Sequence, residues 1–118
     1  MNQMLPQRAY QQAQNVTETA RQTEYRLFAQ VTRALMEAES KDYGAMVRAL
    51  NWNRRLWLTL QADCASDDNR LPESLRAGII SLSIWVDRHS RLVLKKQAAV
   101  GPLVAVNRNI MEGLAQTP

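Results

Sequence analysis

Apolar residues recur along most of this chain at the three- and four-residue spacing of an α-helix, and no stretch alternates apolar and polar residues with the two-residue period of a strand. Only four glycines and four prolines occur in 118 residues, too few for the many turns of a sandwich or barrel. A chain of this length can bury the core of one domain. We therefore predict an all-α fold, a small helical bundle of about four helices.

Start and stop signals divide the pattern into helices. Thr19 and Gln22 have the spacing of a capping box, and Asp42 is the expected N-cap of the second helix. Pro72 occupies a permitted first-turn position of the third helix, and Gly101 with the next proline ends it. The predicted helices cover residues 20–39, 43–64, 72–98 and 102–113.

The first 18 residues differ from the rest in being rich in glutamine and poor in apolar side chains. We expect residues 1–18 to form a mobile N-terminal arm, whose one regular element would be a short helix around residues 8–14. Residues 19–118 are predicted to form a single helical domain.

Each predicted helix carries an apolar stripe that should face the core. Asn53 falls within the stripe of the second helix, so it is a candidate for a buried amide that fixes helix register. The four stripes consist of Leu27, Val31, Ala34, Leu35 and Ala38; Met46, Ala49, Leu50, Asn53, Leu56, Trp57 and Leu60; Leu75, Ile79, Leu82, Val86 and Val93; and Leu103, Val106, Ile110 and Leu114.

The stretch SIWVDRHS, residues 83–90, contains the chain's one histidine with an aspartate and two serines, the side chains of a hydrolytic triad. Successive helical residues turn by about 100°, so Asp87 and His89 diverge by about 160°. The two serines lie about 120° and 100° from His89. No triad can assemble from these residues within one helix. We expect His89 to be a packed, hydrogen-bonded core residue and Asp87 to pair with Arg91 at i,i+4.

The sequence contains no glycine-rich phosphate loop, dinucleotide fingerprint or metal-spaced cluster of histidine, cysteine and carboxylates. We predict a protein that is not an enzyme and binds no cofactor or metal. Cys64 is the single cysteine, which fits a reducing compartment. The first twenty residues lack the apolar segment of a secretory signal, and the longest uncharged apolar-rich run is about half of a membrane span. We expect a cytoplasmic protein that does not bind membranes.

The net charge of +4 and the pI near 9.7 are compatible with nucleic acid, a membrane surface or an acidic protein partner, and also with a basic protein that has no such partner. On the second predicted helix, tryptophans and arginines could serve RNA or a protein, or form a plain solvated face. On the third, isoleucines beside a basic row could receive an amphipathic, acidic helix. The candidate partner-binding residues are Trp52, Arg55, Leu58, Ile80, Ile84, Arg88 and Arg91.

Six short motifs occur in an order that resembles one known family. They are Glu24-Tyr-Arg-Leu-Phe28, Thr32-Arg-Ala-Leu35, Asn53-Arg-Arg-Leu-Trp57, Asn69-Arg-Leu-Pro72, Ser81-Leu-Ser-Ile-Trp-Val86 with His89, and Asn107-Arg-Asn-Ile-Met-Glu-Gly-Leu114. Together they resemble the FlaF family, the flagellar biosynthesis regulators of alphaproteobacteria, over residues 10–114. The segment 1–6 is an extra lead-in relative to that family.

The resemblance implies a small helical protein that binds flagellin as a cytoplasmic export chaperone or coupling factor and links flagellin synthesis to secretion. It also implies action alongside the regulator FlbT. Two other functions stay open: an RNA-binding regulator of flagellin message, and an adaptor that binds FlbT and reaches flagellin indirectly. The family offers no catalytic residues to carry over.

Overall fold

The computed structural model describes residues 24–116, with side chains described as far as Gly113. These residues form the all-α bundle that the sequence predicts. The predicted arm over 1–18, its short helix and the capping box at Thr19 lie outside the described residues. The four helices cover residues 24–38, Tyr43–Ala65 (α2), Glu73–Leu94 (α3) and Gly101–Gln116 (α4).

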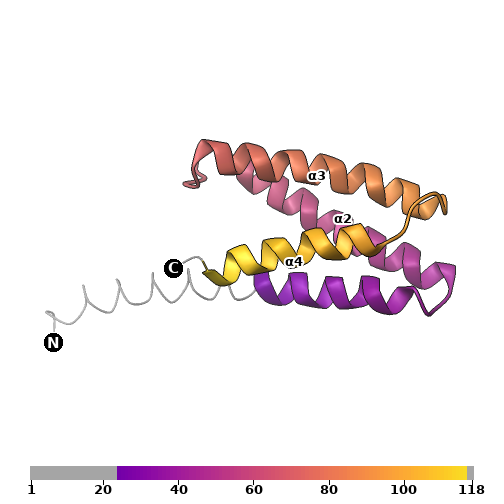
Figure 1. The fold of residues 1–118 in the computed structure, drawn as a ribbon. Coiled ribbons are helices and arrows are strands. Elements are labelled where there is room, and N and C mark those ends of the chain that lie inside the picture. The colour runs from indigo at the N-terminus through magenta and orange to yellow at the C-terminus, as the bar shows by residue number, and fades with distance from the viewer. Residues whose placement is uncertain (1–23, 117–118) are drawn as a thin grey trace, which may run out of the picture.

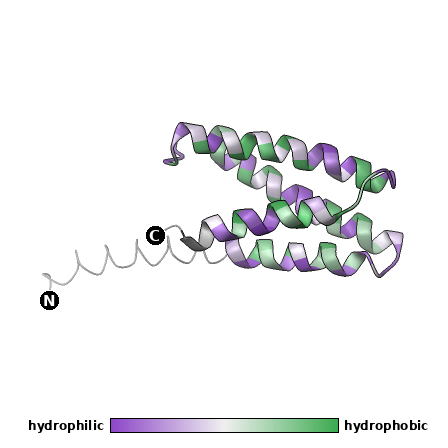
Figure 2. Ribbon diagram, in the orientation of Figure 1, coloured by the Kyte–Doolittle hydropathy of each residue, from purple (hydrophilic) through white to green (hydrophobic). Residues whose placement is uncertain are grey.

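The helices form two pairs that cross each other. The first helix and α4 lie side by side, while α3 runs antiparallel to α2, which passes behind α4 (Figure 1). Polar and apolar residues are interspersed along every helix, as amphipathic helices require (Figure 2). The core therefore lies where the two pairs meet.

The beginning of α2 agrees with the prediction. Asp42 is the N-cap, and its Oδ1 accepts a hydrogen bond from the Ala45 amide at 2.8 Å. The beginning of α4 differs slightly, because Gly101 is already the first helical residue and Pro102 the second. A proline is tolerated there, since first-turn amides have no partner within the helix.

The predicted end of the third helix at residue 98 is wrong, because α3 ends at Leu94. Lys96 has a φ of 61°, in the left-handed region. The Gln97 amide donates to the Leu92 carbonyl at 2.8 Å and the Lys96 amide to the Val93 carbonyl at 3.0 Å, which is the Schellman pattern of a helix C-terminus. Glycine usually occupies this position, and a lysine there gives no sequence signal.

The same helix end is tied to the start of α2. The Tyr43 hydroxyl donates to the Leu94 carbonyl at 2.8 Å, and the Lys96 ammonium lies 5.3 Å from the centroid of the Tyr43 ring. These contacts hold residue 96 in its left-handed conformation and stop α3 from continuing.

We predict that the Lys96→Gly variant is more stable than the Lys96→Ala variant by about 1 kcal/mol. The left-handed backbone conformation costs free energy for alanine, which has a Cβ, and not for glycine. Both variants lose the cation–π contact, so the comparison isolates the backbone effect. The free energy of unfolding in urea measures the difference. If residue 96 continued the helix, alanine would instead be favoured by about 1 kcal/mol.

On α3 the observed core face is rotated from the predicted one. Leu75 and Leu82, predicted to be core residues, are 48% and 37% exposed, whereas Ser83 and Ser90 are buried. Each serine hydroxyl donates to a carbonyl of its own helix, Ser83 to Ile80 at 2.7 Å and Ser90 to Val86 at 2.6 Å. Ser83 and Ser90 are small, and their hydroxyls are hydrogen-bonded within the helix, so they can be buried. They face the core, where the sequence pattern predicts leucine.

Most other stripe residues are buried as predicted, and the structure also buries four hydrophobic residues that the stripes omit, namely Phe28, Cys64, Val100 and Val104. Phe28 packs edge-to-face on Trp57, with ring centroids 5.8 Å apart at 87°. The predicted core residues that are buried are Val31, Leu35, Ala38, Ala49, Leu50, Asn53, Trp57, Ile79, Val86, Val93 and Leu103.

A buried hydrogen-bond network centred on Asn107 links three helices. Its Oδ1 accepts from Trp57 Nε1 at 2.8 Å. Its Nδ2 donates to Asn53 Oδ1 at 2.8 Å and to Thr32 Oγ1 at 3.1 Å. Both asparagines are fully buried. The prediction of a buried amide at Asn53 is confirmed, and its partner on α4 is the residue that sets the packing of the three helices.

We predict that Asn107→Leu lowers the free energy of unfolding by about 3 kcal/mol or more, because Trp57 Nε1 and Asn53 Oδ1 would be buried without partners. The matched control is Asn109→Leu, an exposed position on the same helix, where we expect a change within about 0.5 kcal/mol. Equal effects at the two positions would contradict the structural role of the network.

Candidate functional site

Asp87 joins the outward faces of α2 and α3. Its Oδ1 lies 2.6 Å from Arg54 Nε on α2, and its Oδ2 lies 3.0 Å from Arg91 Nη2 on α3. The i,i+4 pair with Arg91 is confirmed, and the bond to Arg54 is an additional contact between helices. The carboxylate is therefore committed to two guanidinium groups.

The outward face of α2 is hollowed into an open groove of about 790 Å³. It lies on the side of the helix opposite the core stripe. Three of the predicted partner-binding residues, Trp52, Arg55 and Leu58, line it together. Leu58 contributes an apolar side chain that is 51% exposed. The remaining lining residues are Arg48, Asn51 and Arg54.

The α3 candidates form the neighbouring surface. Ile84 is 47% exposed, and Arg88 and Arg91 are exposed as well. Ile80 differs, because it is partly buried and packs against the core. Since Arg54 lines the groove and also binds Asp87, the groove and the α3 surface lie next to each other on the α2–α3 pair. We call the two together the α2–α3 face. Its role in binding stays a prediction.

The residues of SIWVDRHS are used structurally. His89 Nε2 lies 2.7 Å from the Ala99 carbonyl, and because a carbonyl oxygen only accepts, Nε2 carries the proton. The His89 ring stacks on Trp85 at a centroid distance of 4.8 Å. His89 is hydrogen-bonded as expected, but it is half-buried on the flank of α3, not in the core. With Asp87 held by arginines, these side chains do not assemble a triad.

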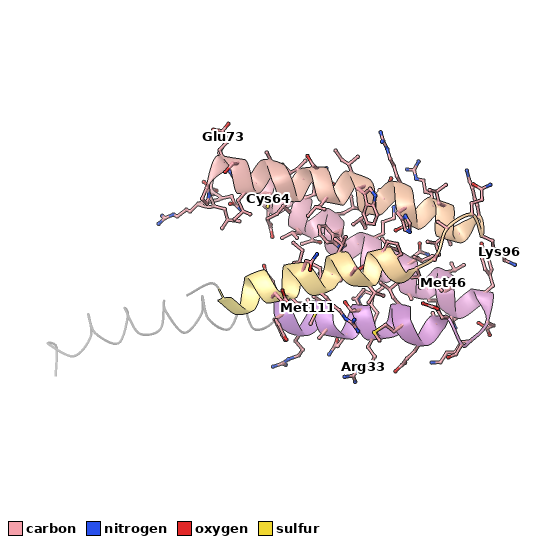
Figure 3. The ribbon with its side chains drawn as sticks, in the orientation of Figure 1. Arg33, Met46, Cys64, Glu73, Lys96 and Met111 are labelled. Carbon is pink, nitrogen blue, oxygen red and sulfur yellow. The ribbon has the colours of Figure 1, made fainter. Side chains whose placement is uncertain are left out.

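A second open groove, of about 560 Å³, lies between the first helix and α4. Met36 and Met111 line it with Arg33 and Arg108. The Arg108 Nη2 atom lies 3.5 Å from the Met36 sulfur. In Figure 3 the labelled Arg33 and Met111 mark these two helices. Our sequence reasoning missed this groove. The two methionines were its signal, but only packing brings residues 36 and 111 together.

Cys64 is buried at the end of α2. Burial raises the pKa of its thiol, and the nearby Asp63 carboxylate raises it further. A raised pKa disfavours the thiolate, which is the nucleophilic form. This cysteine is therefore an inert core residue.

We predict that Cys64 reacts at least about tenfold more slowly with a thiol reagent in the native protein at pH 8 than in urea. A Leu58→Cys variant provides an exposed control whose added thiol should react quickly in the native state. Because folding raises the pKa of the Cys64 thiol, its protonated form contributes to the free energy of unfolding, and this contribution is fully present at neutral pH. The contribution is lost as the pH rises through the raised pKa of the folded state. Rapid native labelling of Cys64 would contradict its burial.

Over residues 24–116, no three histidine, cysteine or carboxylate side chains gather in a way that could hold a metal ion. Within the same range, the helices are too short or too polar to cross a membrane. The described residues do present apolar side chains and arginines on open helical surfaces.

The described residues thus define a small all-α helical bundle. The family model for flagellar protein FlaF matches residues 6–114, and the chain belongs to this family of flagellar proteins. The resemblance seen in the six sequence motifs is thereby confirmed. Searches of curated proteins and of solved structures found no match.

Proposed function

We propose that this protein binds flagellin in the cytoplasm as an export chaperone or coupling factor, linking flagellin synthesis to secretion together with FlbT. Membership of a flagellar family gives the setting. The observation that carries the proposal is the α2–α3 face, where Trp52, Arg55 and Leu58 line one open groove beside Ile84.

The chemistry of this face suits an amphipathic helix. Leu58 and Ile84 offer apolar contacts, and Trp52 offers a large, rigid surface of the kind that anchors protein interfaces. A helix with an apolar side could lie along the groove, as in other helix-in-groove complexes. Covering that side would keep an unassembled flagellin segment from aggregating before export.

Charge favours an acidic segment as the occupant. Arg54 and Arg91 share the single Asp87 carboxylate, so one positive charge remains on this group of three side chains. Arg48 and Arg55 line the same groove as further cations, and Arg88 is exposed on α3. Carboxylates on the polar flank of a bound helix could pair with these guanidinium groups.

We predict that the protein co-elutes with flagellin on a sizing column, and that Leu58→Asp and Ile84→Asp each lower the recovery of the complex at least about tenfold, because a carboxylate would replace an apolar contact. Met36→Asp is the matched control, equally exposed but in the other groove. No complex with wild type would refute flagellin binding. If only Met36→Asp lowered the recovery of the complex, the second groove would be the binding site.

An RNA-binding function has one specific observation in its favour, because Trp52 shares its groove with three arginines. Its signature would be binding to the flagellin transcript leader that weakens steeply with salt. An adaptor would instead bind FlbT and no flagellin. Pairwise mixing of this protein, flagellin and FlbT, with a parallel assay on the transcript, separates the three functions.

A further inference from the structure

A heptad stripe made mostly of large side chains runs along the exposed flank of α3. Its positions follow a spacing of three and four residues, the pattern of a coiled-coil seam. The core residues of α3, which include Ile79, Ser83 and Val86, occupy other heptad positions beside it. We call this stripe the α3 seam; it consists of Leu75, Gly78, Leu82, Trp85, His89 and Leu92.

The seam is exposed although its side chains are apolar. Leu82, Trp85 and Leu92 are 37%, 36% and 41% exposed. His89 and Trp85 are stacked, and the hydrogen bond from His89 to the Ala99 carbonyl fixes that pair. The four large apolar side chains and the fixed histidine thus form a preorganised surface about 25 Å long, at 1.5 Å per residue.

The seam is complementary in shape to itself when two copies run antiparallel. In an antiparallel coiled coil, each a position of one heptad seam packs against a d position of the other. Leu75 would therefore meet Leu92 of the second copy, Gly78 would meet His89, and Leu82 would meet Trp85. A Cβ added at Gly78 would meet no atom within 4 Å, so an open space lies there. That space would receive the stacked aromatic pair of the other chain.

Charge selects the antiparallel orientation. Glu73 and Lys96 lie at opposite ends of α3 (Figure 3). Around the first turn of α3, Asp67, Asp68 and Glu73 outnumber Arg70 and Arg76, which leaves a net charge of −1. Around its last turns, Arg88, Arg91, Lys95 and Lys96 outnumber Asp87, which leaves a net charge of +3. Antiparallel packing brings each acidic end to a basic end, whereas parallel packing would place like charges together.

We propose that two copies of this protein form a symmetric dimer by antiparallel packing of their α3 seams. The seam's own chemistry selects the occupant, since its spacing, the open space beside Gly78 and its charged ends all match a second copy. Ile84 lies on the other side of α3, so both α2–α3 faces stay open in the dimer. The proposal does not depend on flagellin binding.

Sedimentation equilibrium of the full chain tests the dimer, with an expected mass of twice 13.4 kDa for wild type. Leu82→Glu should give the monomer mass, because a carboxylate would be buried against Trp85. Gly78→Gln should do the same by filling the hole, and a glutamine suits the helix better than glycine, so folding is preserved. Ile84→Asp, which removes the predicted flagellin contact, should leave the dimer intact. A circular dichroism spectrum confirms that each variant is helical.

Disulfide trapping tests the orientation. A mixture of Leu75→Cys and Leu92→Cys chains should cross-link, and neither chain should cross-link with its own kind. Self-linking of either variant would overturn the antiparallel packing. A wild-type protein that stays monomeric at all concentrations would overturn the dimer. The same result would follow if residues 1–23 or a flagellin segment covered the seam in place of a second copy. A dimer that survives both Leu82→Glu and Gly78→Gln would overturn the seam as its interface.

Discussion

The buried amide of Asn107 is the interaction on which the arrangement of the helices depends. It is bonded to Thr32 on the first helix and to Asn53 and Trp57 on α2. Without these partners a buried amide is costly, so alternative registers of α4 are disfavoured. The network holds α4 beside the first helix, and α4 therefore does not run along α3 (Figure 1). The exposed flank of α3 is a consequence of that placement.

The α2–α3 pair carries two separate surfaces, one on each side of the contact between the two helices. Ser83 and Ser90 are small core residues, and the Asp87 carboxylate bonds across to Arg54 at the rim. Larger side chains of α3 are left on either side of this contact. Ile84 lies toward the groove of α2, and Leu82 lies on the seam. One helix can thus offer one surface to a partner protein and another to a second copy.

Much of the fold could be predicted from the sequence, since local signals specify it. Helix periodicity gave the four helices, Asp42 marked the start of α2, and the stripe around Trp57 marked the core. The early end of α3 could not be predicted, because Lys96 takes a conformation typical of glycine. Of the candidate site, the residues of the α2 groove could be selected from their outward position. The second groove required the pairing of two distant helices.

The sequence by itself determined the helical class, the amphipathic faces and the membership of a flagellar family. Only the tertiary structure decided which apolar residues of α3 are buried. Leu82 and Ser83 are neighbours about 100° apart on the helix, so a modest rotation exchanges them between core and surface. Periodicity favours the leucine, but the shape of the opposing helices and the hydrogen bonds of the serines favour Ser83. That choice arises from packing between segments far apart in the chain, which no local pattern encodes.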